Sequence, residues 1–189
     1  MEIPKRTPPK VALVPFCRRH VTATVTWVNR REMINLIDRA PTPVTRRGCY
    51  RWYDDIRRDR TRVQFAIEQG KKGLHIGNCG LCDISERSKK AKLWIYIGVK
   101  RLWDKGFGRE ALEQLMSFGF EQLGLNRIYL YVVEDNSRAK RFYEAAGFKR
   151  EGLFRQDTFL EGRFKNTIYY SMLKKEFEKR KYHGTETQR

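Results

Sequence analysis

The sequence predicts an α+β fold built as one domain, and two patterns carry this prediction. Seven short segments are rich in β-branched and aromatic residues and are bounded by turn residues, as strands are. Five other segments repeat their apolar residues at helical spacing. At 189 residues the chain can bury one substantial core. We expect the domain to span 10–178, between a basic, Pro-rich tail at 1–9 and a polar, unstructured tail at 179–189.

The N-terminal third is expected to contain one strand and three helices. The strand covers 11–16. Segment 19–37 mixes strand-favouring residues with an apolar stripe at helical spacing, and we interpret it as two short helices broken around Asn29-Arg30. Thr45 is a suitable N-cap for the third helix. The apolar face of that helix contains Cys49, Trp52, Tyr53 and Ile56.

Three strands are expected in the middle of the chain. Segments 63–68 and 74–84 favour strands, and the glycine-containing stretch 69–73 between them predicts a hairpin. A fourth strand covers 92–99. Because it is apolar at most positions, we expect it to be buried on both faces.

The C-terminal half is expected to alternate helices and strands. A helix covers 109–123 and ends at a glycine, and a fifth strand covers 126–133. Asn136 or Ser137 caps a shorter helix, which also ends at a glycine. Two last strands are expected over 148–154 and 165–173, joined by a loop that contains 161–163.

The formal charge of +18 is large for this size and favours attraction to anions such as phosphorylated cofactors, nucleic acid or ribosomes. It disfavours polycations such as polyamines as substrates. The N-terminus is too rich in proline for a signal peptide, and no run approaches the ~18 apolar residues of a membrane helix. We therefore expect a cytoplasmic protein with no membrane partner.

Cysteine usage predicts no metal site. Cys79 and Cys82 have the spacing of half a zinc site, but the sequence offers no second pair of ligands at a matching spacing. Positions three apart on a strand also point to opposite faces of a sheet. We expect the cysteines to be small structural hydrophobes.

The glycine loop at 100–111, between the fourth strand and the next helix, allows three interpretations. As Gly-x-Gly-x-x-Ala it suggests a dinucleotide-binding turn, but such a turn follows its strand immediately, and here about six residues intervene. As Lys-Gly-Phe-Gly it matches half of an RNA-recognition strand. That strand would continue with alternating aromatics, whereas this chain continues with the helical Arg-Glu-Ala-Leu.

The third interpretation is a cradle for the pyrophosphate of coenzyme A. Gly106 and Gly108 allow main-chain amides to turn toward a diphosphate, and the following helix presents its positive end. Lys105 and Arg109 can add positive charge. A purely structural glycine loop is the alternative, so a second motif is needed to decide.

A second motif is present at 136–148, which reads Asn-Ser-Arg-Ala-Lys-Arg-Phe-Tyr-Glu-Ala-Ala-Gly-Phe. Together with the glycine loop it resembles the GNAT superfamily of acyl-CoA-dependent N-acetyltransferases. Members of that family have the motifs Arg/Gln-x-x-Gly-x-Gly/Ala and Asn-x-x-(Ala)-x-x-x-Tyr-x-x-x-Gly-Phe. Segments 27–29, 151–155 and 161–163 are typical of the ribosomal-protein-alanine acetyltransferase-like branch, which this sequence resembles most.

The resemblance implies a three-layer fold, with a mixed, mostly antiparallel sheet of about seven strands between helices on both faces. It also implies acetyl-CoA as the cofactor. The strand end from Ile97 to Val99 should pair with the pantetheine and supply an oxyanion donor, and Asn136 should bind the cofactor, cap its helix, or do both. The main-chain amides expected to hold the pyrophosphate belong to Trp103, Asp104, Lys105, Gly106, Phe107 and Gly108.

The resemblance further implies that a primary amine attacks the thioester directly. Tyr143 matches the family tyrosine near the sulfur, so we expect it to contact the cofactor and act as general acid; a core aromatic is the alternative. Two positions depart from the family: Trp103 replaces the usual Arg or Gln, and Lys92 stands where this branch often has a Glu base. Glu134 is one candidate base, and a chain of water molecules is another.

The predicted function is acetyl transfer from acetyl-CoA to a primary amine on a protein N-terminus, an amino sugar or another small molecule. The positive charge favours an acceptor on an anionic carrier, either a ribosomal protein N-terminus or a nucleotide-linked amino sugar. The alternative is a basic nucleic-acid or ribosome-binding protein that retains the fold. Either a monomer or a homodimer is expected.

Overall fold

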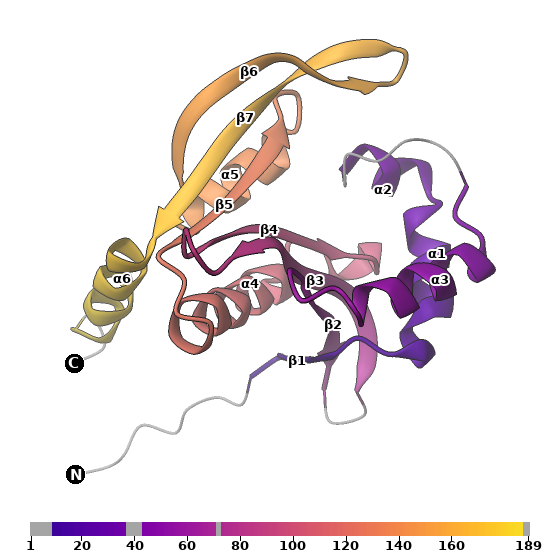
Figure 1. The fold of residues 1–189 in the computed structure, drawn as a ribbon, viewed down its shortest axis with the longest axis horizontal. Coiled ribbons are helices and arrows are strands. Elements are labelled where there is room, and N and C mark those ends of the chain that lie inside the picture. The colour runs from indigo at the N-terminus through magenta and orange to yellow at the C-terminus, as the bar shows by residue number, and fades with distance from the viewer. Residues whose placement is uncertain (1–8, 37–42, 71–72, 187–189) are drawn as a thin grey trace.

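A seven-stranded sheet forms the middle layer of the fold (Figure 1). The structure is a computed structural model that describes residues 9–36, 43–70 and 73–186. The strands are β1 (Val11–Pro15), β2 (Val63–Gln69), β3 (Leu74–Ser85), β4 (Lys90–Ile97), β5 (Arg127–Val133), β6 (Lys149–Leu160) and β7 (Arg163–Leu173). Their order is β1-β2-β3-β4-β5-β7-β6, and every neighbouring pair is antiparallel except β4 and β5. The mixed, mostly antiparallel sheet is therefore confirmed.

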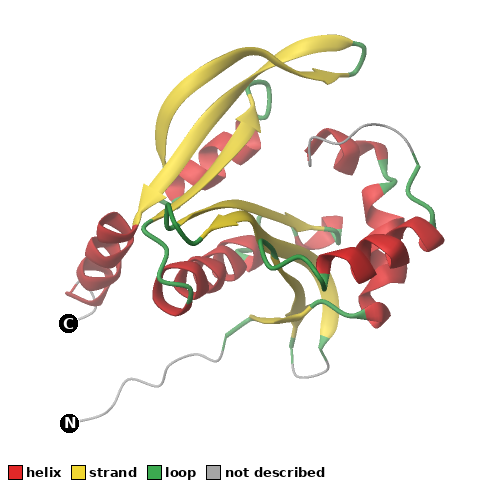
Figure 2. Ribbon diagram, in the orientation of Figure 1, coloured by secondary structure: helices red, strands yellow, loops and turns green. Residues whose placement is uncertain are grey.

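Helices cover both faces of the sheet (Figure 2). They are α1 (Val21–Val28), α2 (Arg31–Leu36), α3 (Arg46–Ile56), α4 (Phe107–Ser117), α5 (Ser137–Ala145) and α6 (Lys174–Glu186). On one face a large core includes Leu112 of α4, Tyr143 of α5 and Phe177 of α6. On the other face a smaller core forms around Val21 of α1 and Cys49 of α3. The predicted three-layer arrangement is confirmed.

The predicted break between α1 and α2 is confirmed and has a local cause. Asn29 ends α1, and its side chain both donates to the carbonyl of Val44 and accepts from its N–H, each at 2.8 Å. Thr45 caps α3, because its hydroxyl accepts a hydrogen bond from Gly48 N at 3.0 Å. These contacts tie the end of α1 to the start of α3.

The parallel neighbours β4 and β5 pair over only three residue pairs, beginning at Lys90 and Arg127. Both strands then continue, β4 to Ile97 and β5 to Val133, and they separate toward their carboxyl ends. Main-chain groups on the facing edges consequently lack a ladder partner there. Because such groups need hydrogen bonds from another source, the gap is suited to a ligand.

One face of β4 is less buried than predicted. Ala91 and Leu93 lie in the core under α4. Lys92, Trp94 and Tyr96, on the opposite face, are only partly buried. The expectation that this strand is buried on both faces is wrong, because its second face lines a cavity instead of packing against a helix.

The end of α4, which follows β4, and the start of α5, which follows β5, agree with the prediction. α4 continues into a π-helical turn over Phe118–Gln122, and Gly124 follows that turn. Asn136 caps α5, because its Oδ1 accepts a hydrogen bond from Ala139 N at 3.0 Å. The capping role of Asn136 is thereby confirmed.

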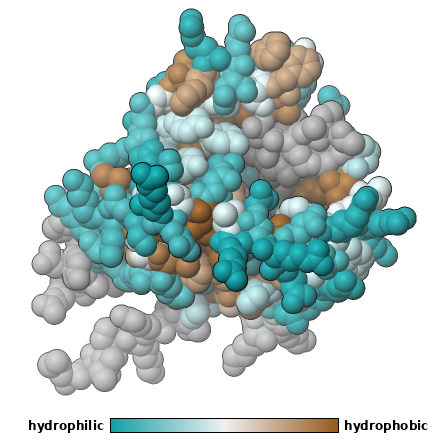
Figure 3. Space-filling model, viewed as in Figure 1, coloured by the Kyte–Doolittle hydropathy of each residue, from teal (hydrophilic) through white to brown (hydrophobic). Residues whose placement is uncertain are grey.

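The strands β6 and β7 form a long hairpin that rises beyond the rest of the sheet (Figure 1). The sequence predicted an end at Phe154, but β6 continues to Leu160. Since almost every residue of β6 is exposed, its sequence lacks the apolar alternation that marks a strand. Near the turn, Phe159 and Phe164 stack edge to face and are more than half exposed. Figure 3 shows apolar side chains along this upper edge of an otherwise largely hydrophilic face.

The prediction of an unstructured tail after residue 179 is wrong, because α6 runs to Glu186. Phe177 is buried against Phe120, with 5.1 Å between ring centroids, and Lys181 pairs with Glu121. One buried apolar residue among charged residues is too weak a pattern to predict a helix from the sequence. Of the predicted tail at 1–9, residues 1–8 lie outside the described chain, and the domain boundaries remain a prediction.

We expect Gly98, which follows β4, to be essential for packing α1 against the sheet. The indole of Trp27 lies on this glycine, and a Cβ added there would lie 2.0 Å from Trp27 Cδ2. Trp27 is buried, so it cannot simply move away. Gly98→Ala should lower the free energy of unfolding by about 1–3 kcal/mol, a typical cost of overpacking, in urea denaturation. Gly152→Ala is the control, because its added Cβ would meet no atom within 4 Å; equal stability of the two variants would contradict this packing role.

Candidate active site

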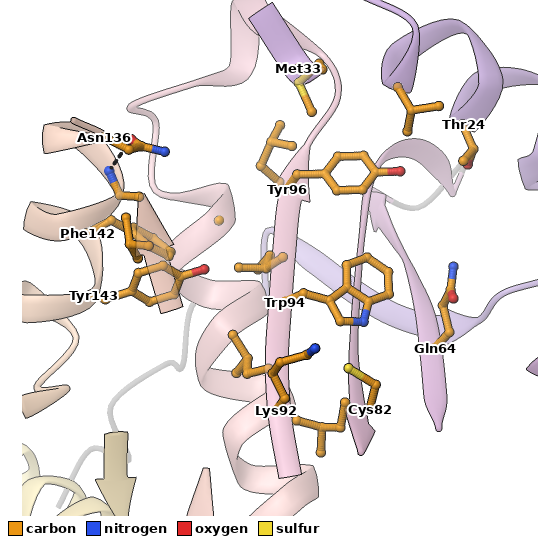
Figure 4. A pocket seen from close by; sticks show the side chains of 18 of the residues that line it. Thr24, Met33, Gln64, Cys82, Lys92, Trp94, Tyr96, Asn136, Phe142 and Tyr143 are labelled. Carbon is orange, nitrogen blue, oxygen red and sulfur yellow. Dashed lines mark hydrogen bonds between the residues drawn. The ribbon is translucent and has the colours of Figure 1, made fainter. Parts of the chain in front are cut away.

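A cavity of about 1150 Å³ occupies the gap between β4 and β5 and continues over the face of the sheet that α1 and α3 cover (Figure 4). Its loop half is lined by residues of β5 and α5 and by Leu102, Trp103, Asp104, Gly106, Gly108 and Arg109. Its sheet half is lined by β2, β3 and β4 together with α1 and α3. The two halves meet at β4, so a ligand in one half can reach a ligand in the other.

The loop half contains an uncapped helix start. Gly106 is the N-cap of α4 at φ +84°, a conformation that side-chain-bearing residues rarely adopt. No side chain within 9–36, 43–70 or 73–186 caps this helix, so its first main-chain N–H groups are available to a ligand. Gly108 lines the cavity between Ile97 and Phe142, where an added Cβ would lie 3.6 to 3.7 Å from their side chains. This arrangement suits a phosphate group.

Most of the predicted cofactor-binding residues line the cavity, whereas Val99, Lys105 and Phe107 do not. Phe107 packs in the main core, and Lys105 is exposed. Val99 N donates to Ile76 O at 3.3 Å, toward β3 and away from the gap. The main-chain amides of Lys105 and Phe107 remain predicted contacts. The residues that do line the cavity are Ile97, Trp103, Asp104, Gly106, Gly108, Asn136 and Tyr143.

Arg138 of α5 joins the two sequence motifs, a role that sequence reasoning missed. Its guanidinium lies 4.2 Å from the centroid of the Trp103 ring and 3.2 Å from Asp104 Oδ1. Trp103 Nε1 in turn donates to the carbonyl of Ile97 at 2.7 Å. This chain of contacts ties α5 to the loop and the loop to β4. The other basic residues that line the loop half are Arg109 and Arg141.

The edge of β4 that faces the gap has main-chain groups free for a ligand. Gly98 N donates to Ile76 O at 2.8 Å, so this residue faces β3. Main-chain groups alternate along a strand, which directs Ile97 and Ile95 toward the gap. The carbonyl of Ile97 is taken by the indole of Trp103, but the N–H groups of both isoleucines can bind an extended ligand as an added strand would.

Tyr143 places its hydroxyl in the cavity (Figure 4). Its ring packs against Phe142 and Phe148, with 5.1 and 5.7 Å between centroids, so it also belongs to the core. Burial raises the pKa of the hydroxyl above its ordinary value, and the group is protonated near neutral pH. Among the described residues no group hydrogen-bonds to this hydroxyl, so its proton is available to a ligand.

The structure does not bring Glu134 together with the other predicted catalytic residue. Its carboxylate accepts a hydrogen bond from Asn166 Nδ2 of β7 at 2.8 Å. It is not among the residues that line the cavity, whereas Tyr143 is. Asp104 is the one carboxylate in the lining that the structure describes, and it is paired with Arg138.

A buried polar network supports the far end of the sheet half. Asn78 is fully buried on β3, and its Nδ2 donates to Thr24 Oγ1 at 2.9 Å and to the hydroxyl of Tyr96 at 2.6 Å. Its Oδ1 contacts His75 Nε2 at 2.9 Å, and burial lowers the pKa of this histidine. The network fixes Thr24 and Tyr96, both of which line the cavity. The sequence could not predict this network, because its members come from α1, β3 and β4, whose packing and register were unknown.

Three of the four cysteines are buried, and Cys17 is only partly buried. Cys79 is buried in the main core, where burial raises the pKa of its thiol, and Cys82 faces the cavity on the other side of the sheet. All four cysteines are free thiols. Across 9–36, 43–70 and 73–186, no three His, Cys, Asp or Glu side chains are grouped as they would be around a metal ion.

Comparison with known proteins shows which family the chain belongs to. The model of the GNAT acetyltransferase domain matches residues 10–149. A spermidine N(1)-acetyltransferase of Vibrio cholerae is 32% identical over 57% of this chain and 61% of its own length. YdaF of Bacillus subtilis, provisionally named a ribosomal N-acetyltransferase, is 30% identical over 56% of this chain and 57% of its own length. The match thus spans about three fifths of these relatives.

A solved structure agrees with this fold. The spermidine N-acetyltransferase of V. cholerae in complex with CoA and spermine superposes with a TM-score of 0.83 at 23% identity, covering 89% of this chain and 98% of that one. The chain belongs to the GNAT family of acyl-CoA-dependent N-acetyltransferases, and the family's cofactor is acetyl-CoA. The family and cofactor predicted from the two motifs are confirmed. No helix among the described residues is long and apolar enough to cross a membrane.

We expect a side chain at position 108 to block coenzyme A. A Cβ added at this position already lies at ordinary contact distance from the side chains of Ile97 and Phe142. The two further methyl groups of a valine would fill the entrance between β4 and α5. Gly108→Val should therefore abolish binding of CoA in calorimetry. Gly108→Ala, whose single methyl fits, should bind with a much smaller loss, and unchanged affinity in the valine variant would contradict the assignment of this loop.

Proposed function

We propose that this chain transfers the acetyl group of acetyl-CoA to a primary amine by direct attack. The observation that supports this best is the cavity itself, which places an uncapped helix start, a free strand edge and a protonated tyrosine around one gap. Such a site supplies positioning, hydrogen-bond donors for an oxyanion and an acid, which are the needs of acyl transfer to an amine. Release of free thiol from acetyl-CoA in the presence of amines tests it.

The residues of the loop half fit the cofactor. The first amides of α4, with Arg109, Arg138 and Arg141, would hold its phosphates. The main-chain groups of Ile95 and Ile97 would bind its pantetheine, and one of their N–H groups would donate to the oxyanion. Acetyl-CoA, when bound, supplies an activated thioester.

Tyr143 serves as general acid in this proposal. Its hydroxyl faces the gap and is protonated near neutral pH, as an ordinary tyrosine is, and burial raises its pKa further. Asn136 holds the start of α5, and thereby this tyrosine, through its cap. We assign removal of the amine proton to water in the cavity, because Glu134 is directed toward Asn166.

The acceptor is a primary amine, and its carrier is a further part of the proposal. The net charge of +18 supports a ribosomal protein N-terminus or a nucleotide-linked amino sugar. The relatives include proteins named for spermidine and for ribosomal substrates, so similarity supports more than one class of amine. Nucleic-acid binding rests on net charge alone and remains the alternative, as the cytoplasmic location remains a prediction.

Replacing Tyr143 with phenylalanine tests the assignment of the acid. The ring contacts with Phe142 and Phe148 survive this change, so only the hydroxyl is lost. We expect kcat to fall by ~10- to 1000-fold, the range for loss of an acid catalyst, while the affinity for acetyl-CoA changes little. Steady-state thiol release and calorimetry measure the two quantities.

A matched control is Tyr129→Phe, which removes a hydroxyl from β5 outside the cavity lining. This variant should keep the kcat of the parent. If Tyr143→Phe turned over as fast as the control, Tyr143 would be a core residue and not the acid.

A further inference from the structure

The sheet half of the cavity has a floor organised in rows across three strands. The pairing register places Gln64 of β2 beside Gly80 of β3, and Gly80 beside Trp94 of β4. The neighbouring row pairs Cys82 with Lys92. Gln64, Trp94, Cys82 and Lys92 all line the cavity, and Figure 4 shows them facing it from three strands.

Gly80 gives this floor its shape. A Cβ added there would lie 2.9 Å from Trp94 Cζ2 and 2.4 Å from the carbonyl oxygen of Val63. Without a side chain at this position, the indole of Trp94 lies across β3 toward Gln64. The floor therefore offers an aromatic surface beside the side-chain amide of Gln64.

The polar groups on this floor are hydrogen-bond donors. Gln64 Nε2 is buried and has no hydrogen-bond partner among the residues that the structure describes, so a ligand oxygen is the kind of group that would satisfy it. Lys92 Nζ lies 3.1 Å from Asp83 Oδ2, which leaves further ammonium hydrogens for a ligand. Arg62 lines the same half and is held by Asp59 at 2.8 Å.

The carboxylates that hold these cations do not themselves line the cavity. Asp83 is half exposed, so solvent screens its charge more than that of Lys92, whose side chain is 26% exposed. Asp104, the carboxylate among the described lining residues, belongs to the loop half. The described part of the sheet half thus has two basic residues and no acidic one for a polyamine to bind.

We propose that the sheet half selects a primary amine that also bears a carboxylate or phosphate, which Lys92 and Gln64 bind while Trp94 contacts the body of the molecule. This inference rests on the proposed function and names its acceptor class. It separates the chain from relatives named for spermidine, because Lys92 would repel a polyamine acceptor. Lys92 is then a specificity residue and takes no part in removing the amine proton.

Three amines of equal chain length test this preference in the full-length protein. They are 6-aminohexanoate, hexylamine and 1,6-diaminohexane, which have six carbons each and carry an anionic, a neutral and a cationic group at the far end. We expect kcat/KM for acetylation to be about tenfold higher for 6-aminohexanoate than for 1,6-diaminohexane, the scale of one partly screened charge contact with Lys92. A higher kcat/KM for 1,6-diaminohexane or spermidine would overturn the proposal.

Substitutions at Lys92 and Gln64 locate the effect. Lys92→Glu should reverse the preference, and the milder Lys92→Met should remove it, while the affinity for CoA stays unchanged in both. Gln64→Leu should weaken 6-aminohexanoate alone. Lys90→Glu is the matched control, because it makes the same charge change on the same strand outside the cavity lining. Equal effects of Lys90→Glu and Lys92→Glu would overturn the assignment to the cavity.

Binding of the same amines to the complex with CoA separates this inference from the proposed function. Calorimetry of that complex needs no turnover, so tight binding of 6-aminohexanoate without thiol release would contradict the transferase activity and support the acceptor class. Tighter binding of 1,6-diaminohexane would overturn the acceptor class alone. Glucosamine 6-phosphate against glucosamine, and Gly-Gly against its amide, then show whether phosphate or carboxylate is the preferred anion.

Discussion

The structure depends on the short pairing of β4 with β5. These strands run parallel and share three residue pairs at their amino ends, after which they separate. A parallel pair requires a crossover, and here α4 returns the chain from the carboxyl end of β4 to the amino end of β5. The start of α4 and the start of α5 consequently lie at the carboxyl ends of the separating strands. Both sequence motifs therefore meet at one gap although about thirty residues separate them in the chain.

Two close approaches between a tryptophan ring and a glycine shape the sheet half of the cavity. Trp27 lies on Gly98 at the end of β4, and Trp94 lies across Gly80 on β3. In both places an indole occupies the space that a side chain would need. These contacts bring α1 and the floor of the sheet half close to β4 without filling the gap. The site is thus formed by packing on the face of the sheet that α1 covers and by missing pairing within the sheet.

Much of the fold and the loop half could be predicted from the sequence, because these features depend on local residue patterns. The cap at Asn136, the break after Asn29 and the glycine loop each have a short signature. The sheet half could not be predicted, because Gln64 and Trp94 become neighbours only through the register of three strands. The ends of β6 and α6 were missed for another reason: exposed, charged segments give no apolar period to read.

The charge of the whole chain and the charge of the cavity carry different information. The net charge of +18 sets the long-range attraction to anions. Recognition inside the cavity depends instead on which carboxylate fixes the position of each basic side chain. Lys92, Arg62 and Arg138 are each paired with a carboxylate at 2.8 to 3.2 Å. Such pairs restrict long side chains before a ligand arrives, so less conformational entropy is lost on binding. Fixed donors of this kind discriminate between anions and cations more sharply than a mobile basic surface would, because a cationic ligand meets a charge that cannot turn away.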